Sequence, residues 1–119
     1  KGIAGMLENV PREKLIGGVP FYTRLWTEAG DGTITSKAMG IAEEKRWVDN
    51  NQVELTWQAD TAQYYGEVQT SDGAQFLWME EERSLKEKMN VIRQNDLAGV
   101  ACWKLGFEDS AAWDSIQWN

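Results

Sequence analysis

Apolar and polar residues alternate along the stretch GGVPFYTRLW, residues 17–26, as they do in an extended chain with two different faces. One face carries the mainly apolar set Val19, Phe21, Thr23 and Leu25. The other face carries Tyr22, Arg24 and Trp26. We therefore predict a strand over residues 15–26. Its second face is either a cation–π ladder on a solvated sheet or a surface that binds something.

The spacing of apolar residues changes on either side of this strand. Residues 1–10 have helical spacing and resemble the end of an amphipathic helix. Residues 27–35 are polar and rich in glycine, which predicts a link, and Ser36 is placed to cap a helix over residues 37–49. Three short segments rich in β-branched and aromatic residues follow, which predicts a small antiparallel sheet. The sequence TSDG between the last two is typical of a hairpin turn.

The last third of the chain predicts a helix, a strand and a short helix. Ser84 and Glu87 have the spacing of a capping box, so we expect a helix over residues 85–95. The run LAGVACWKLGF predicts a strand over residues 97–104 that is buried on both faces, and Asp109 or Ser110 caps a final helix. Two strands separated by a helix predict a parallel βαβ crossover, with an α+β insert directly after the first strand.

Composition narrows the classes of function. The chain of 119 residues is long enough for one domain or for part of a larger one. It is too short for a complete (β/α)8 barrel, which needs about 250 residues. The net charge of −7 argues against nucleic acid or an anionic membrane as partner, and no long apolar run predicts a membrane span. The sequence has no histidine and one cysteine, Cys102, so we expect no histidine-dependent catalysis, disulfide, metal site or cofactor. A chain that opens at Lys1 in the middle of a helical pattern is expected to belong to a longer protein.

Three segments together resemble the C-terminal part of a family 18 glycoside hydrolase: REKLIGGVPFYTRLW, AQFLWMEEERSLKEK and LAGVACWKLGFEDSAAWDSI. In that family the seventh barrel strand resembles G-x-P-x-Y-x-R, an insertion domain follows it, and the eighth strand carries a tryptophan. The resemblance covers essentially the whole chain. It implies an α/β fold, namely a partial (β/α)8 barrel made of the last two strands with their helices, carrying an α+β insertion domain. The implied divisions are residues 1–26, 27–82 and 83–119.

The resemblance also implies a partner. Thr23, where chitinases commonly have glycine, and the sequence GFED after the last strand are similar to the bacterial spore-cortex and germination branch of the family. That branch acts on the N-acetylglucosamine of peptidoglycan, whereas other members act on chitin. The implied partner is a glycan that contains N-acetylglucosamine, and the implied location is the bacterial cell envelope, the spore or the extracellular space.

Five residues are candidates for binding such a glycan. Trp103 matches the tryptophan that forms the floor of the family's sugar site, although without the resemblance it is a core residue. Tyr22 and Arg24 match the wall of the site, and the alternative is that Arg24 pairs with an acidic residue while Tyr22 stacks inside the barrel. Trp26 either lines the cleft or supports the insert, and Trp78 either overhangs the cleft or packs within the insert.

The family's catalytic signature, D-x-x-D-x-D-x-E, is absent from the sequence. The acidic run Glu80–Glu82 precedes a predicted helix, where negative charge is stabilised, so we do not assign it to catalysis. We expect a fragment of a glycoside hydrolase that supplies a wall and the floor of the sugar site but no catalytic residue. The alternative is a carbohydrate-binding or protein-interaction module. Because a quarter of a barrel has open sheet edges, the excised chain is expected to form a homodimer or an oligomer with exchanged elements.

Overall fold

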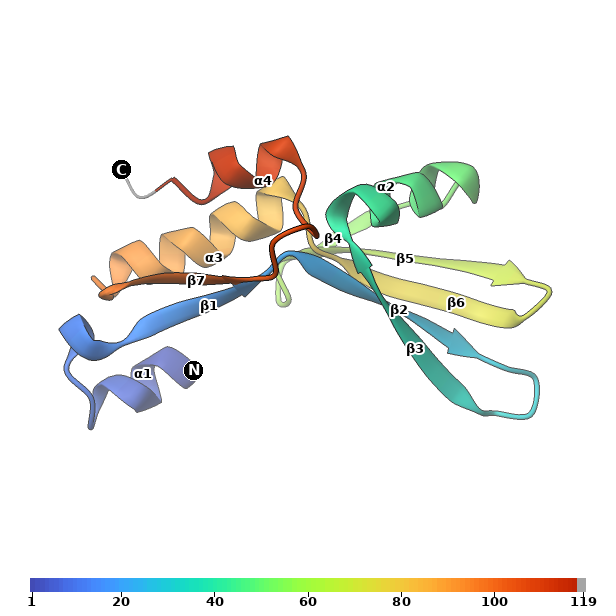
Figure 1. The fold of residues 1–119 in the computed structure, drawn as a ribbon. Coiled ribbons are helices and arrows are strands. Elements are labelled where there is room, and N and C mark those ends of the chain that lie inside the picture. Colours follow the sequence, from blue (N-terminus) through green and yellow to red (C-terminus); the bar gives the residue numbers. More distant parts are fainter. Residues whose placement is uncertain (118–119) are drawn as a thin grey trace.

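The computed structural model, which describes residues 1–117, contains two sheets that meet near Phe21 (Figure 1). The first is a parallel pair, β1 (Ile16–Pro20) and β7 (Gly99–Trp103). The second has five antiparallel strands in the order β3-β2-β6-β5-β4. Figure 1 shows α3 (Glu82–Gln94) and α4 (Ser110–Ser115) on one side of the parallel pair, and the five-stranded sheet extending away from it. The mixed α/β fold class is as predicted.

The parallel pairing of the two long segments is confirmed, but the single strand over residues 15–26 is wrong. The chain passes from α1 (Gly2–Leu7) through a 3-10 turn at Arg12–Lys14 into β1, which ends at Pro20. It then enters the other sheet as β2 (Tyr22–Glu28). The alternation of faces continues through both strands, so it could not reveal the change of sheet. The change occurs at Phe21, whose ring is fully buried and meets the edge of the Trp113 ring.

The predicted link over residues 27–35 is mostly strand. β2 and β3 (Ile34–Gly40) form a hairpin whose turn is closed by Gly32 at φ 84° and by the Asp31 carboxylate, which accepts from the Thr33 N–H. The helix predicted from residue 37 therefore starts later, as α2 (Ile41–Asn50) with Gly40 at its N-cap. Cross-strand pairing holds Ser36 in β3, where its hydroxyl accepts from Arg24 and caps nothing.

The small antiparallel sheet is confirmed as β4 (Thr56–Gln58), β5 (Gln63–Thr70) and β6 (Gly73–Met79). The TSDG hairpin is also confirmed. Gly73 has φ 125°, and a Cβ there would lie 2.2 Å from the Glu28 carbonyl oxygen, so only glycine fits. Because β2 and β3 join this sheet, the insert has five strands where three were expected.

The N-cap of α3 is Glu81, whereas the sequence analysis predicted Ser84. The Glu81 carboxylate accepts from the Arg83 and Ser84 N–H groups, while the Ser84 hydroxyl accepts from the Glu81 N–H. The helix therefore begins at Glu82, three residues earlier than expected. At α4 the prediction holds, because the Asp109 carboxylate accepts from the Ala112 N–H at 2.9 Å.

Two hydrophobic cores lie on either side of the change of sheet. The core under α3 and α4 contains the buried residues Val19, Phe21, Ile41, Leu85, Met89, Ile92, Leu97 and Ala112. The core of the five-stranded sheet contains Leu25, Met39, Val48, Leu77 and Met79. The Lys45 ammonium of α2 joins the two parts, 2.5 Å from the Asp109 carboxylate and 3.5 Å from that of Glu82.

One expectation about β7 is wrong. Val100 and Cys102 are partly buried and pack against the first core, but Ala101 and Trp103 on the opposite face are exposed. The strand is therefore buried on one face only.

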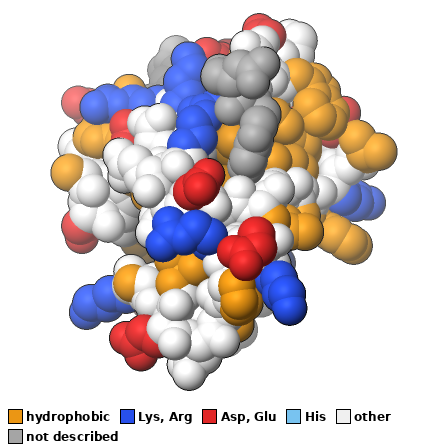
Figure 2. Space-filling model, turned by 90° about the vertical axis from the view of Figure 1, so that its left-hand side faces the viewer, with side chains coloured by type: hydrophobic (Ala, Val, Ile, Leu, Met, Phe, Trp, Pro, Cys, Tyr) orange, Lys and Arg blue, Asp and Glu red, His pale blue; other side chains and the backbone are white. Residues whose placement is uncertain are grey.

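Figure 2 views the end of the molecule that carries α1, where hydrophobic side chains gather beside charged ones. No helix in residues 1–117 is long and apolar enough to cross a membrane.

Candidate functional site

The open face of the β1–β7 pair holds the first part of the candidate site. The parallel register places Gly18 beside Ala101 and Pro20 beside Trp103, all on the face away from α3. Because the neighbours are small, the Trp103 side chain stands free and is 67% exposed. A hollow of about 370 Å³ lies here, and its lining residues are Gly18, Val19, Pro20, Tyr22, Ala101, Cys102 and Trp103.

A second, smaller hollow of about 240 Å³ lies on the five-stranded sheet. Its lining residues are Pro20, Tyr22, Thr23, Arg24, Trp26, Gln63, Trp78 and Glu80. Pro20 and Tyr22 line both hollows, so the two adjoin across the change of sheet. The structure therefore brings the five predicted binding residues to one continuous surface, with Trp103 at one end and Trp78 at the other.

Arg24 is held in place by neighbours on its own face of the sheet. Its Nε and Nη2 donate to the Ser36 hydroxyl at 3.1 and 2.8 Å, and its guanidinium carbon lies 6.0 Å from the centre of the Trp26 ring. Within residues 1–117 Arg24 forms no salt bridge, so the predicted alternative of an acidic partner has no support there. Nη1 donates to no described residue. Arg24 is thus oriented by a hydroxyl and a ring while retaining donors for a ligand.

The aromatic candidates both line hollows and contact other rings. Tyr22 meets the Phe107 ring with centroids 6.4 Å apart. Trp26 pairs across strands with Phe76, and Trp78 lies 5.1 Å from the Tyr65 ring. For Trp26 and Trp78 the two predicted roles are therefore compatible, because each lines the hollow and also packs within the insert.

Glu80, which the sequence analysis interpreted only as part of an acidic run before a helix, lines the second hollow. It is 1% exposed, and its carboxylate accepts from Lys88 at 2.8 and 2.9 Å, from Ser84 at 2.6 Å and from Gln63 at 3.1 Å. Its backbone N–H donates to the Thr23 hydroxyl at 2.7 Å. Glu80 therefore ties β2, β5 and α3 together behind the second hollow. The signal in the sequence is the four-residue spacing of Glu80, Ser84 and Lys88, which places a carboxylate just before the helix N-cap close to two side chains on one face of α3.

Glu44 on α2 is a second buried carboxyl group. The residue is fully buried, and neither carboxylate oxygen has a hydrogen-bond partner among the described residues. Burial, together with the negative charges of Glu80 and Glu81, raises the pKa of Glu44 to about 9. Glu44 is therefore protonated and neutral at pH 7. In the sequence it lies on the same helical stripe as Ile41 and Val48, which marks it as inward-facing.

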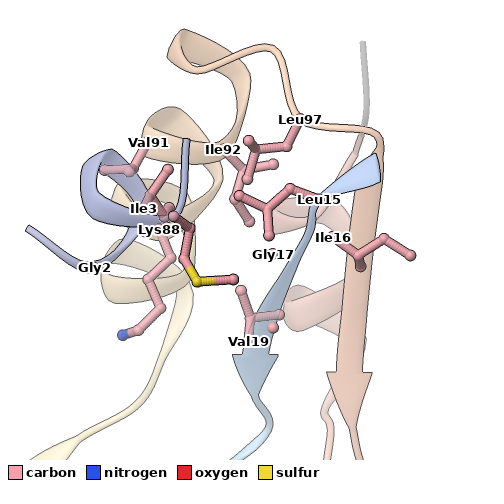
Figure 3. Close-up of a pocket in the computed structure, with 12 residues that line it drawn as sticks. Gly2, Ile3, Leu15, Ile16, Gly17, Val19, Lys88, Val91, Ile92 and Leu97 are labelled. Atoms are coloured by element: carbon pink, nitrogen blue, oxygen red, sulfur yellow. The ribbon is translucent and has the colours of Figure 1, made fainter. Parts of the chain in front are cut away.

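Another hollow, of about 480 Å³, lies elsewhere (Figure 3). It runs along β1 between α1 and α3, and Figure 3 shows Leu15, Val19 and Ile92 among the side chains around it. Its lining is apolar except for Lys88, so it lacks the convergent polar groups that orient a sugar. We therefore do not assign it as the ligand site. Among residues 1–117 no cluster of three potential metal ligands occurs.

Comparison with known proteins places this geometry in a family. The model of glycosyl hydrolases family 18 matches residues 3–108. The chain is 25% identical over 109 residues to the cortical fragment-lytic enzyme of Bacillus subtilis, covering 90% of this chain and 25% of that protein. It is 24% identical over 111 residues to putative chitinase 1 of Margaritifera margaritifera, covering 88% of this chain and 24% of that protein. The chain thus spans about a quarter of these relatives.

Solved structures show the same fold. A chitinase from Chromobacterium violaceum superposes with a TM-score of 0.84 at 22% identity, over 94% of this chain and 34% of that one. The spore cortex-lytic enzyme SleL of Bacillus megaterium superposes with a TM-score of 0.81 at 23% identity, over 92% of this chain and 26% of that one. Since the family model matches most of its length, the chain belongs to glycosyl hydrolases family 18.

Proposed function

We propose that this chain is part of a glycoside hydrolase and supplies a wall and the floor of a site for β-linked N-acetylglucosamine polymers. The observation that carries the proposal is that Tyr22 lines both hollows, so that Trp103 on one sheet and Arg24 on the other face a common surface. The names of similar proteins support the ligand class. They include a cortical fragment-lytic enzyme, a putative chitinase, and a class V chitinase from Nicotiana tobaccum solved in complex with NAG4.

The proposed roles follow from the chemistry of the side chains. A pyranose ring has a face of C–H groups that packs on an indole, and Trp103 offers an exposed indole beside small residues. The Tyr22 hydroxyl both donates and accepts hydrogen bonds, and the Arg24 guanidinium donates several. Trp103 then forms the floor, while Tyr22 and Arg24 form the wall. Trp26 and Trp78 extend the wall.

We further propose that β1 and β7 are the last two strands of a (β/α)8 barrel, with the insertion domain between them. In residues 1–117, β1 pairs with β7 alone, and β7 with β1 alone. In the complete barrel, earlier elements would pack along the outer edge of β1, where the 480 Å³ hollow lies. By itself the chain is proposed to cover these edges by dimerising or exchanging elements. A monodisperse monomer in light scattering would contradict this.

The chain is proposed to have no hydrolase activity of its own. A glycosidase needs a carboxyl group poised over the scissile bond as general acid. Glu80, the carboxylate that lines the second hollow, is bound by Lys88, Ser84 and Gln63 and is buried, so it is poorly placed to protonate a leaving group. The catalytic motif named by the resemblance is absent from the sequence.

The test is an incubation of the purified chain with N-acetylglucosamine tetramer and with spore-cortex glycan. The expected result is binding of the tetramer in a calorimetric titration and no release of reducing ends. Release of reducing ends that is abolished by Glu80→Gln would overturn the proposal and make Glu80 catalytic. Absence of tetramer binding would overturn the assignment of floor and wall.

A further inference from the structure

The insert, formed by the five-stranded sheet and α2, is joined to the rest of the chain at two crossings that lie close together. The first crossing is at Phe21, between β1 and β2, and the second is at Glu80, between β6 and α3. The Thr23 hydroxyl accepts from the Glu80 N–H at 2.7 Å, which places the crossings side by side. Two adjacent crossings define a hinge axis, about which the insert could turn as a rigid body. Only an attachment away from this axis fixes the angle between the two sheets.

Residues 104–109, which we call the connecting loop, make such an attachment. The loop follows β7, precedes α4 and passes the start of α2 (Figure 1). The Phe107 carbonyl accepts from the Ile41 N–H at 2.7 Å. Ile41 is the first residue of α2, and its N–H is one of the donors that a helix leaves unpaired at its N-terminus. The connecting loop thus binds the backbone of the insert directly.

Phe107 also packs closely against Gly40, the N-cap of α2. A Cβ at Gly40 would lie 2.9 Å from the Phe107 carbonyl oxygen and 3.0 Å from the Phe107 Cα, so a side chain there would displace the loop. Gly40 has φ −67° and ψ 164°, which any residue adopts. The glycine is therefore required by the close approach of the loop, and its backbone conformation does not require it.

Asp109 makes the second contact between the connecting loop and the insert. One carboxylate oxygen accepts from the Lys45 ammonium of α2 at 2.5 Å, and the other accepts from the Ala112 N–H of α4 at 2.9 Å. The Asp109 side chain is only 19% exposed, so this ion pair is partly shielded from water. One carboxylate therefore holds α2 and α4 together.

The other polar contacts between the insert and the rest of the described chain lie beside the hinge axis. Arg83 donates to the Tyr64 hydroxyl at 3.2 Å, and Lys88 donates to the Glu80 carboxylate at 2.8 and 2.9 Å. Both donors lie in the first two turns of α3, directly after the second crossing. These contacts tie the insert to the segment that already carries it, whereas the connecting loop comes from a separate part of the chain.

We propose that Phe107 and Asp109 are positioning residues, which fix the angle of the insert relative to the β1–β7 pair. Neither residue lines the two hollows of the candidate site. Each acts through the relative position of the two sheets, because the proposed floor lies on β7 and the proposed wall on the insert. The assignment of the angle stands on the contacts of the loop, and its consequence for glycan binding rests on the proposed function.

The first test measures residual dipolar couplings of backbone amides in a weakly aligning medium, which report whether the two sheets tumble as one body. The unmodified chain should fit one alignment tensor. Gly40→Ala adds a methyl group between Phe107 and the insert, and it should require two tensors of different magnitude. Asp109→Asn should do the same. Asn is as good an N-cap as Asp, so this variant leaves α4 capped and removes the charge that faces Lys45.

Glu108→Gln is the matched control. Glu108 lies between the two positioning residues, and its carboxylate accepts from the Gly106 N–H at 2.7 Å within the loop. This variant should keep one tensor, and two tensors would overturn the assignment to Phe107 and Asp109. One tensor in folded Gly40→Ala would overturn the role of Phe107, and one tensor in Asp109→Asn would overturn that of Asp109. The Asp109 side chain lies near the surface, so its variant keeps the test decisive if Gly40→Ala does not fold.

The second test measures the affinity for N-acetylglucosamine tetramer by calorimetry. Apparent affinity falls with the fraction of molecules at the competent angle, so it should fall about fivefold in Gly40→Ala and Asp109→Asn if that fraction is about one fifth. Glu108→Gln should bind as the unmodified chain does. Two tensors with unchanged affinity would support the assignment of the angle and overturn its consequence for binding. Absence of tetramer binding in the unmodified chain would overturn the proposed function, while the dipolar couplings would still decide whether Phe107 and Asp109 fix the angle.

Discussion

The two sheets differ in how completely they bury their surfaces. The five-stranded sheet has its own core and a helix, α2, over that core. The β1–β7 pair has only two strands, with α3 and α4 on one face and an exposed tryptophan on the other. A sheet of two strands is marginal in water, whereas a sheet of three or more strands with a covered face can be stable.

The two sheets therefore contribute differently to stability and to binding. The parallel pair depends on the helices that pack on it, and its open face is free to present side chains such as Trp103 to a ligand. The five-stranded sheet has its own buried core, and on its open face Ser36 and Trp26 orient the Arg24 guanidinium. Substitutions in the first core should therefore destabilise the whole chain, whereas substitutions on the open faces should mainly weaken binding.

The largest effect is expected from Phe21→Ala. Phe21 is fully buried where the chain changes sheet, so removing the ring leaves a cavity between the two parts. The free energy of unfolding should fall by about 3–5 kcal/mol in urea titrations. Phe76→Ala, on the open face, is the matched control and should cost clearly less. Equal losses in the two variants would mean that the open face contributes as much to stability as the core.

A smaller effect is expected from Lys88→Met, which breaks the link between α3 and the insert. The change leaves the buried Glu80 carboxylate without its cation, and because the Lys88 side chain is 31% exposed we expect a loss of about 2 kcal/mol. The double variant Glu80→Gln with Lys88→Met should recover part of it, as measured by a double-mutant cycle. Strictly additive losses would show that the two side chains do not interact.

The third prediction concerns pH. The pKa of Glu44 is about 9 in the fold and near 4.5 in the unfolded chain, so the unfolded state binds fewer protons between these values. The stability of the chain should therefore fall as pH rises from about 4.5 to 9. Glu44→Gln removes this contribution. Its stability relative to the unmodified chain should rise by up to about 1 kcal/mol per pH unit within that window.

The control for the third prediction is Glu43→Gln on the same helix. Glu43 is partly exposed and paired with Lys37 at the surface, so its substitution should change the free energy of unfolding at pH 7 by no more than about 0.5 kcal/mol. Thermal unfolding at several pH values makes the comparison. A constant difference between Glu44→Gln and the unmodified chain would contradict a neutral buried Glu44.

The sequence predicted most of the fold because strong local signals agreed with the final packing. The TSDG hairpin, the Asp109 cap and the parallel relation of the two long segments were all read correctly. The change of sheet at Phe21 could not be predicted, because side chains alternate in the same way before and after it. The β2–β3 hairpin was missed because the glycines in its turn resemble those of a link.

Prediction of the candidate site depended on the resemblance. Alternation alone placed Tyr22, Arg24 and Trp26 on one face, and the hollow that they line agrees with that. Composition favoured a core position for Trp103, and only the family motif suggested an exposed one. Glu80 was read only as part of a helix start, because one partner of its carboxylate, Gln63, comes from the distant strand β5. Glu44 was missed although its spacing from Ile41 and Val48 predicts an inward position.

The most direct test is Trp103→Ala in this chain, because Trp103 is proposed to bind the glycan while contributing little to stability. Trp103 is 67% exposed, so the free energy of unfolding should stay within about 0.5 kcal/mol. The affinity for N-acetylglucosamine tetramer, measured by calorimetry, should fall at least about tenfold. Trp113→Ala, which removes a ring from the edge of Phe21, should do the opposite and lower stability while preserving affinity. Unchanged tetramer affinity in folded Trp103→Ala would show that Trp103 does not form the floor of a sugar site.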